Sequence, residues 1–197
     1  METGIMLLIG YLLGSLNFAI IISKLVVKTD IRSFGSGNAG ATNALRALGK
    51  KWGAVVLLGD ILKCAVASII AVCLFSGFEM PLYGAVLGAV LGHNFPLYYK
   101  FKGGKGIIVS ITGIFFLNWQ IALIILAFAL VIMALTRYVS LGSVSAAVLA
   151  PILAYIMARD IFDLILILAS LAIYMHRANI YRLIDGTENR LGAKKPI

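Results

Sequence analysis

The stretch RSFGSGNAGATNALR, residues 32–46, lies between two apolar runs at residues 5–27 and 55–75. Each run has the ~20 residues that a helix needs to cross a bilayer. Within the stretch, glycines are interspersed with serine, asparagine and threonine, and an arginine stands at each end. Glycine lets backbone N–H groups approach an anion closely, and a helix expected from about Thr42 would add its positive N-terminus. We interpret residues 32–46 as an oxyanion cradle in a membrane protein, with phosphate as its ligand.

The same residues fit two other patterns. Residues 35–40 match the Gly-x-Gly-x-x-Gly fingerprint of dinucleotide sites, which needs a preceding strand and an acid about 20 residues later. Here a membrane-length apolar run precedes it, and the next acid, Asp60, lies inside another such run. A plain loop between two membrane helices is the simpler alternative, because loops use Gly, Ser and Asn for their turns. Taken alone, residues 32–46 do not decide between a plain loop and an oxyanion cradle.

Composition places the whole chain in the membrane. Hydrophobic residues make up 61% of the 197 residues, the mean hydropathy is +1.02, and charged residues make up 13%, against about 25% in soluble domains. The formal net charge is +9, but the basic residues lie in loops beside apolar runs, which suits an anionic substrate or lipid headgroup rather than nucleic acid. The two cysteines, Cys64 and Cys73, give neither a metal spacing nor a disulfide framework.

The apolar runs predict an all-α integral membrane protein with seven transmembrane helices in a single domain, residues 1–197. The run at 107–135 is interrupted at Asn118–Trp119 and counts as two spans, because one span would put Arg137 and the basic C-terminus on opposite sides. This places the N-terminus outside and the C-terminus in the cytoplasm. The first run has no positive segment before it, so we expect it to be kept rather than cleaved. The other spans are predicted at residues 5–27, 55–75, 81–97, 144–157 and 161–175.

Glycines inside the runs predict close helix packing. The four-residue spacing that lets two helices approach occurs in Gly10 and Gly14 and again in Gly84, Gly88 and Gly92.

Polar residues inside the runs predict buried contacts. Asn17 is expected to face other helices rather than lipid. Asp60 and Lys63 lie one helical turn apart, so we interpret them as a structural ion pair, with a functional role as the alternative. His93 is expected to be a hydrogen-bonded residue at a helix end.

Residues 100–106, KFKGGKG, form a second Gly-rich basic loop. The loop is not a P-loop, because Gly106 stands where Ser or Thr should follow Gly104–Lys105. It can still lay backbone donors and the Lys105 ammonium against a phosphate.

The C-terminal part carries a third set of polar residues. Residues 137–143 form a short turn with two hydroxyls, and His176, Asn179 and Arg182 are spaced by three, so a continuing helix would place them on one face. The basic residues beyond are expected to be a solvated tail: Arg190, Lys194 and Lys195.

Taken together, these segments resemble the bacterial acyl-phosphate:glycerol-3-phosphate acyltransferase family. The resemblance rests on three blocks in the family's order: residues 35–43, residues 103–106, and residues 176–188, which contain His176, Asn179, Arg182, Gly186 and Glu188. Smaller matches are Asp60-x-x-Lys63, Gly92–His93 and residues 137–141. Any one block is weak, but the ordered set spans nearly the whole chain and is highly specific.

The resemblance implies a seven-helix enzyme of the bacterial cytoplasmic (inner) membrane, with its active site facing the cytoplasm. It implies transfer of a fatty acyl group from acyl phosphate to the sn-1 hydroxyl of glycerol 3-phosphate. The products would be lysophosphatidic acid and phosphate, the first step of phospholipid biosynthesis. The family uses no metal or organic cofactor. The expected partners are acyl phosphate, glycerol 3-phosphate and membrane lipid, without nucleic acid, and no protein partner is inferred.

The chemistry of individual residues suggests roles in this reaction. Arginine suits bidentate contact with phosphate, lysine acts as a compact charge, and Glu188 is expected to orient an arginine or histidine. The catalytic candidates are Ser36, Arg46, Lys105, His176 and Asn179. The candidates for substrate and phosphate binding are Gly37, Asn38, Gly40, Thr42, Asn43, Gly103, Gly104, Ser143, Arg182 and Glu188.

No residue is an evident covalent nucleophile, since Ser36 has no His–Asp partner in the sequence. Phosphate is a good leaving group, so direct attack by the glycerol hydroxyl is favoured, with His176 or a substrate phosphate oxygen as the base. Neither histidine begins the His-x-x-x-x-Asp pattern of thioester-using acyltransferases, because Tyr98 and Tyr181 stand five residues on. A transporter for a small organic phosphate is the alternative function, although no convincing internal repeat supports it.

Overall fold

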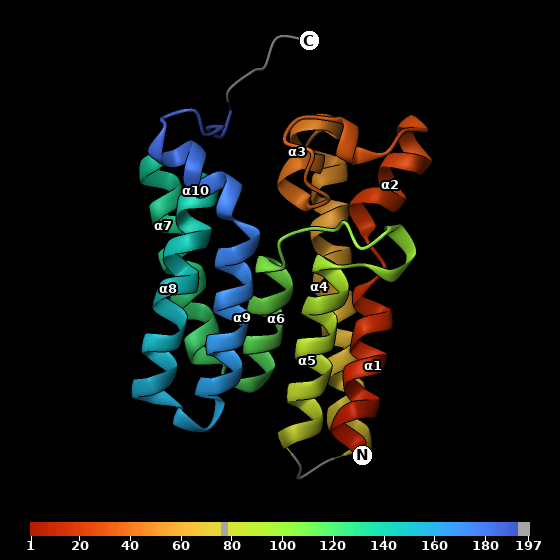
Figure 1. The fold of residues 1–197 in the computed structure, drawn as a ribbon, viewed down its shortest axis with the longest axis vertical. Coiled ribbons are helices and arrows are strands. Elements are labelled where there is room, and N and C mark those ends of the chain that lie inside the picture. The colour runs from red at the N-terminus through yellow and green to blue at the C-terminus, as the bar shows by residue number, and fades with distance from the viewer. Residues whose placement is uncertain (76–78, 193–197) are drawn as a thin grey trace. The chain divides into compact units, whose positions relative to one another are not determined.

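The computed structural model describes residues 1–75 and 79–192, and within these ranges the chain is helical, without a strand (Figure 1). The all-α fold class is therefore confirmed. The α-helices are α1 (Glu2–Gly14), α2 (Phe18–Val27), α3 (Ala41–Leu48), α4 (Lys50–Leu74), α5 (Glu79–Asn94), α6 (Ile107–Leu117), α7 (Trp119–Thr136), α8 (Val139–Met157), α9 (Phe162–Met175) and α10 (Arg177–Ile184). Short 3₁₀ turns lie in the connections: η1 (Ile31–Ser33), η2 (Leu97–Tyr99) and η3 (Arg159–Ile161).

Among the described residues, 4 helical segments are long and apolar enough to cross a membrane, or up to 5 if the bent pair α9–α10 is one span. The segments are α1 with α2, then α4, α7 and α8. Helix α6 is apolar, but its 11 residues extend only about 16 Å at 1.5 Å per residue. The seven-span count would need α5 and α6 as well, and it stays a prediction.

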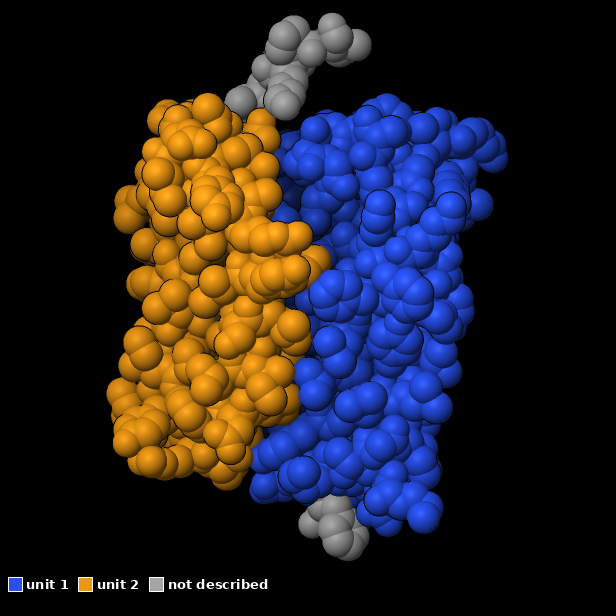
Figure 2. All heavy atoms as spheres, in the orientation of Figure 1, with its two compact units in different colours: residues 1–117 blue, residues 118–197 orange. Residues whose placement is uncertain are grey.

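Residues 1–117 and residues 118–197 form two compact units, blue and orange in Figure 2. Unit 1 contains α1 to α6 and unit 2 contains α7 to α10. In unit 1, α2 and α3 lie at the end opposite the N-terminus, and the connection between α5 and α6 lies below them in the view (Figure 1). Arg32, in the first Gly-rich loop, bonds to this connection.

Unit 1 is built around the contact between α1 and α5, where the predicted glycine spacing is used by both helices. A methyl group added at Gly10 or Gly14 of α1 would overlap backbone carbonyls of α5. A methyl group added at Gly84, Gly88 or Gly92 of α5 would overlap backbone carbonyls of α1. The two backbones therefore lie closer than side chains would allow, which confirms the packing prediction.

The first apolar run is broken, where one continuous span over residues 5–27 was expected. Helix α1 ends at Gly14 and α2 begins at Phe18. The buried Asn17 caps α2 by accepting the Ile20 N–H (3.1 Å), and its Nδ2 donates to the carbonyl of Ala39 (3.2 Å). The helix breaks because this amide is satisfied by capping and by a distant carbonyl, and it faces the interior of the unit, as predicted.

Helix α4 buries charged side chains and exposes large apolar ones. Asp60 and Lys63 are buried, while Leu58, Leu62 and Val66 of the same helix are exposed. Helices of soluble proteins show the opposite distribution, with charged residues exposed. A segment that faces lipid is expected to expose its apolar side chains.

In unit 2, α8 contacts both α7 and α9. Asn118 caps α7 through its side chain, which accepts the Ile121 N–H (3.0 Å), so the run at 107–135 is two helices, as predicted. Helices α9 and α10 meet at His176 with a bend of 57°. The last helix does not continue straight, but α10 still carries Asn179 and Arg182 on its own turns.

Candidate functional site

The cradle, residues 32–46, is shaped by Asn43. Its Oδ1 accepts the Ser36 N–H (3.0 Å), and its Nδ2 donates to the carbonyls of Phe34 (3.0 Å) and Ile31 (3.2 Å). Gly35 has a φ of +56°, and a methyl group there would overlap the Asn43 amide. Asn43 was predicted to bind phosphate, and in the structure its buried amide bonds to the backbone of the loop.

The groups that the cradle offers to a ligand come from its tip and from the start of α3. Ser36 and Gly37 are exposed, and Asn38 and Thr42 are half-buried. Within the described ranges, the side chains of Ser36, Asn38 and Thr42 have no hydrogen-bond partner. Helix α3 starts directly after Gly40 without a side-chain cap, so its first N–H groups have no intrahelical acceptor. These donors suit an oxyanion.

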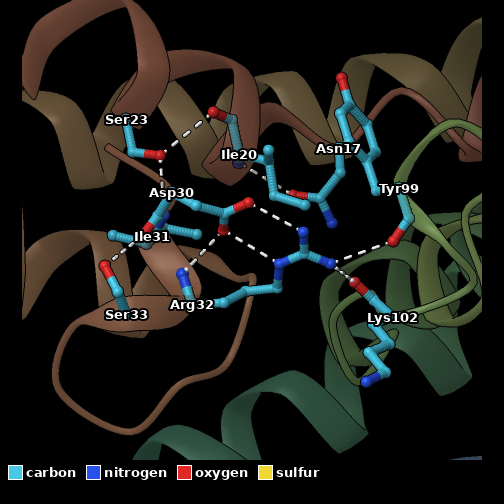
Figure 3. A network of polar contacts seen from close by, with 9 residues as sticks. All are labelled: Asn17, Ile20, Ser23, Asp30, Ile31, Arg32, Ser33, Tyr99 and Lys102. Atoms are coloured by element: carbon cyan, nitrogen blue, oxygen red, sulfur yellow. Dashed lines mark hydrogen bonds and ion pairs between the residues drawn. The ribbon is translucent and has the colours of Figure 1, made fainter. Parts of the chain in front are cut away.

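Arg32 fixes the cradle to the connection between α5 and α6 rather than adding charge for a ligand (Figure 3). Its guanidinium pairs with Asp30 (2.8 Å) and donates to the carbonyls of Tyr99 (3.0 Å) and Lys102 (2.9 Å). The hydrogen bond from Arg32 holds the pKa of Asp30 below its ordinary value, so the pair stays ionised at neutral pH. Arg46, at the other end of the cradle, is exposed on the last turn of α3.

The second Gly-rich loop, residues 100–106, packs against the C-terminal end of α5. The N–H groups of Gly103 and Gly104 donate to the carbonyls of Asn94 (3.1 Å) and His93 (3.0 Å). We expected these two N–H groups to face a phosphate, but helix α5 uses both. Packing explains the glycines, because a methyl group at Gly103 would overlap the His93 carbonyl. Lys105 follows directly and is half-buried.

The two Gly-rich loops meet at Gly104. A methyl group there would overlap the ring of His93 and approach the carbonyl oxygen of Ala39, in the cradle, to 2.8 Å. Only glycine fits this contact. The structure thus brings the cradle and the loop that carries Lys105 together at one end of unit 1.

A buried ionic cluster lies beneath this contact. Lys63 Nζ is 2.9 Å from Asp60 Oδ1, which confirms the predicted ion pair. The same Nζ lies 2.8 Å from His93 Nδ1 and donates to the carbonyl of Leu16 (3.2 Å). His93 is therefore a bonded residue at the end of α5, as predicted, but its partner Lys63 was not foreseen.

In unit 2, Glu188 is the centre of a second polar cluster. Its Oε1 accepts from Ser140 (2.9 Å) and Asn179 (2.8 Å), and its Oε2 accepts from Arg182 (2.7 Å). Burial alone would raise the pKa of Glu188, but the hydrogen bonds from Asn179, Arg182 and Ser140 outweigh it, so the pKa lies below its ordinary value. An ionised carboxylate holds Asn179 and Arg182 in place on α10.

Two of the predicted residues of unit 2 make other contacts. His176 is buried at the bend, with Nδ1 2.8 Å from the Ala172 carbonyl, and the Ser143 hydroxyl donates to the Val139 carbonyl (2.9 Å). Ser140, one turn before Ser143, is the serine that joins Glu188. Ser140 was not among the predicted site residues, although it lies within the smaller match at residues 137–141.

The start of the tail is tied to the turn between α7 and α8. Arg190 donates to the hydroxyl of Tyr138 (3.0 Å) and its guanidinium lies 5.2 Å from the ring centroid. The Leu191 N–H donates to the Arg137 carbonyl (2.7 Å), and the Arg137 guanidinium donates to the Leu191 carbonyl (2.9 Å). Arg190 is exposed, as the prediction of a solvated tail expects, but its contact with Tyr138 was not foreseen. Lys194 and Lys195 lie outside the described residues.

A family model described as glycerol-3-phosphate acyltransferase matches residues 4–186. This chain belongs to the glycerol-3-phosphate acyltransferase family. It is an acyltransferase and an integral membrane protein, and membership of this family decides against the transporter alternative.

Relatives and solved structures agree with this family. The chain is 45% identical over 192 residues to a glycerol-3-phosphate acyltransferase of Thermoanaerobacter pseudethanolicus (96% of each chain). It is 47% identical over 195 residues to that of Shouchella clausii (95% of each). The crystal structure of PlsY (YgiH), an integral membrane glycerol 3-phosphate acyltransferase, is similar in its glycerol 3-phosphate form, with a TM-score of 0.89 and 37% identity over 98% of this chain and 96% of that one. Its lysophosphatidic acid form has a TM-score of 0.86 and 36% identity, with the same coverage.

Proposed function

We propose that this acyltransferase moves a fatty acyl group from acyl phosphate to the sn-1 hydroxyl of glycerol 3-phosphate, giving lysophosphatidic acid and phosphate. The observation that carries the proposal is the meeting of two Gly-rich, cation-bearing loops at Gly104, in a chain whose structural relative was solved in glycerol 3-phosphate and lysophosphatidic acid forms. A reaction whose donor and acceptor each carry a phosphate needs more than one oxyanion contact.

Phosphate binding falls to the groups of unit 1 that the fold leaves for a ligand. These are the Ser36 and Thr42 hydroxyls, the Asn38 amide, and the first N–H groups of α3. The N–H groups of Gly37 and Gly40 already donate to the carbonyls of Phe34 (2.9 Å) and Asn38 (3.1 Å), so these glycines shape the cradle around the ligand. Arg46 and Lys105 add the charge. Charge-assisted contacts of this kind are stronger than neutral ones, and lysine suits a phosphate as a compact charge.

In unit 2, Glu188 preorganises Asn179 and Arg182 for the acceptor. The carboxylate bonds to both, so their side chains are already ordered before a substrate arrives. Only the Nε–H of Arg182 donates to Glu188, so the other N–H groups of the guanidinium can donate to a substrate phosphate. Ser143 completes the set of acceptor-binding residues.

The acyl transfer is a direct displacement. The glycerol hydroxyl attacks the acyl carbon, the carbon–oxygen bond to phosphate breaks, and the hydroxyl proton passes to a base. His176 suits that role in its neutral form, because an Nδ1–H donated to the Ala172 carbonyl leaves the lone pair on Nε2. A phosphate oxygen of a substrate is the alternative base. A His176→Gln variant tests the choice, since loss of turnover with unchanged KM values favours the histidine.

The donor distinguishes this proposal from a thioester-dependent reaction. Neither histidine has an Asp five residues on, so the usual activation of the acceptor hydroxyl for thioester chemistry is missing from the sequence. Purified protein should be assayed with long-chain acyl phosphate and with the matching acyl-coenzyme A at equal concentration, following lysophosphatidic acid and released phosphate. We expect turnover with acyl phosphate and little or none with the thioester. Comparable rates would overturn the donor assignment and leave the acceptor assignment intact.

A further inference from the structure

We infer that Asp60, Lys63 and His93 are positioning residues that hold the loop of Lys105 in place for phosphate binding. The inference rests on the proposed function of that loop and goes beyond a structural ion pair. Its starting point is that three polar residues from α4 and α5 are buried together directly below Gly104, although burying a charge is costly unless it is fully paired.

The ammonium of Lys63 has three partners in this cluster. It forms an ion pair with Asp60 Oδ1 (2.9 Å), and it lies within hydrogen-bond distance of His93 Nδ1 (2.8 Å) and the Leu16 carbonyl (3.2 Å). The Leu16 carbonyl lies in the break between α1 and α2. Lys63 thus joins α4 to α5 and to the α1–α2 break, and it fixes the His93 ring from its Nδ1 side.

The opposite side of the His93 ring contacts the loop. A methyl group at Gly104 would overlap His93 Nε2 and approach Cε1 to 2.8 Å, so the ring edge lies directly on the Gly104 backbone. The Gly104 N–H also donates to the His93 carbonyl (3.0 Å). A residue that Lys63 holds on one side therefore contacts Gly104 with both its ring and its backbone.

The other side of Gly104 depends on a buried polar residue as well. The Ala39 carbonyl that faces Gly104 accepts a hydrogen bond from Asn17 (3.2 Å), which is the cap residue of the α1–α2 break. Gly104 is thus held between His93 and Ala39. His93 bonds to Lys63, which also bonds to Leu16, and Ala39 bonds to Asn17, so both contacts are linked to the α1–α2 break. Because Lys105 is the next residue, a shift of the ring changes where the Lys105 ammonium lies.

The first test is hydrogen exchange in purified wild-type protein and in His93→Gln, which keeps the Asp60–Lys63 ion pair. We expect the amides of Gly103 and Gly104 to exchange at least about tenfold faster in the variant, while those of α3 stay unchanged. The matched control is Ser68→Ala, a buried polar residue farther along α4, which should leave the loop amides as they are. Unchanged exchange in His93→Gln overturns the inference.

The second test is kinetic. We expect His93→Gln to raise the KM for a phosphorylated substrate by about tenfold with kcat within about twofold, because the loop binds but does not react. In a Lys105→Ala background the same substitution should add little, since both act through one contact. An effect that adds in full to that of Lys105→Ala shows a purely structural role and overturns the inference. Faster loop exchange with unchanged KM values upholds the positioning of the loop but contradicts its proposed phosphate role.

A second variant covers the case in which His93→Gln does not fold. Asp60→Asn combined with Lys63→Met removes both charges together, so neither is left buried without its partner. It should show the same faster exchange at Gly103 and Gly104 and the same rise in KM.

Discussion

The ammonium of Lys105 is the charge that the second Gly-rich loop is proposed to bring to phosphate. Removing a cation that bonds to a phosphate should cost at least ~2 kcal/mol, which is more than tenfold in kcat/KM. We therefore expect Lys105→Ala, and Arg46→Ala in the cradle, each to lower kcat/KM more than tenfold, measured with purified, monodisperse protein. Lys50→Ala is the matched control, because it removes the same side chain from an exposed position at the start of α4. Full activity in a folded Lys105→Ala variant would contradict the proposal.

The lowered pKa of Glu188 should make the stability of the protein depend on pH. Its folded pKa lies below the ordinary 4.5, so its contribution is fully present above pH 4.5 and is lost as the pH falls through the folded pKa. Glu188→Gln should therefore lower Tm most near neutral pH, and the difference from wild type should shrink below about pH 4. Thermal unfolding of both proteins across pH 3–7 checks this. A difference that grows toward acid pH would show that the carboxylate is not the stabilising form.

At the scale of elements, the contact of α1 with α5 depends on the absence of side chains. A leucine at Gly88 would collide with the α1 backbone, and overpacking costs about 1–3 kcal/mol even where side chains can move. We expect Gly88→Leu to lower Tm strongly or to prevent folding, while Gly4→Leu, in α1 with nothing within 4 Å, should be nearly silent. Equal Tm values for the two variants would show that the helices do not need this close approach.

Some of these elements could be predicted from the sequence and others could not. The break at Asn118 was predictable, because a polar residue interrupts an apolar run that is too long for one span. The break at Asn17 was not, because it depends on the Ala39 carbonyl, which only the folded chain brings near. For the same reason the role of Asn43 in folding the loop could not be predicted. An amide that folds a loop and an amide that binds phosphate have the same composition and spacing, and they differ only in which carbonyls lie nearby.

At the scale of the whole molecule, the proposed topology has N-terminus outside and C-terminus in the cytoplasm. It predicts that α4 crosses the membrane once, so its two flanks lie on opposite sides. In a background of Cys64→Ala and Cys73→Ala, Lys51→Cys should react only with reagents that reach the cytoplasm. Glu79→Cys should react with an impermeant maleimide added to intact cells. Both residues are exposed in the structure, so labelling of both from the same side would disprove the topology.

The cluster around Glu188 also bears on how the protein is made. Ser140, Asn179 and Arg182 all bond to Glu188, and all three precede it in the chain. Because synthesis runs from the N-terminus, the three donors are made before their common acceptor. Helices α7 to α9 can therefore begin to enter the membrane during translation before this cluster can form. An incomplete chain that stops before Glu188 lacks its central acceptor, so it cannot assemble the cluster however well its helices insert.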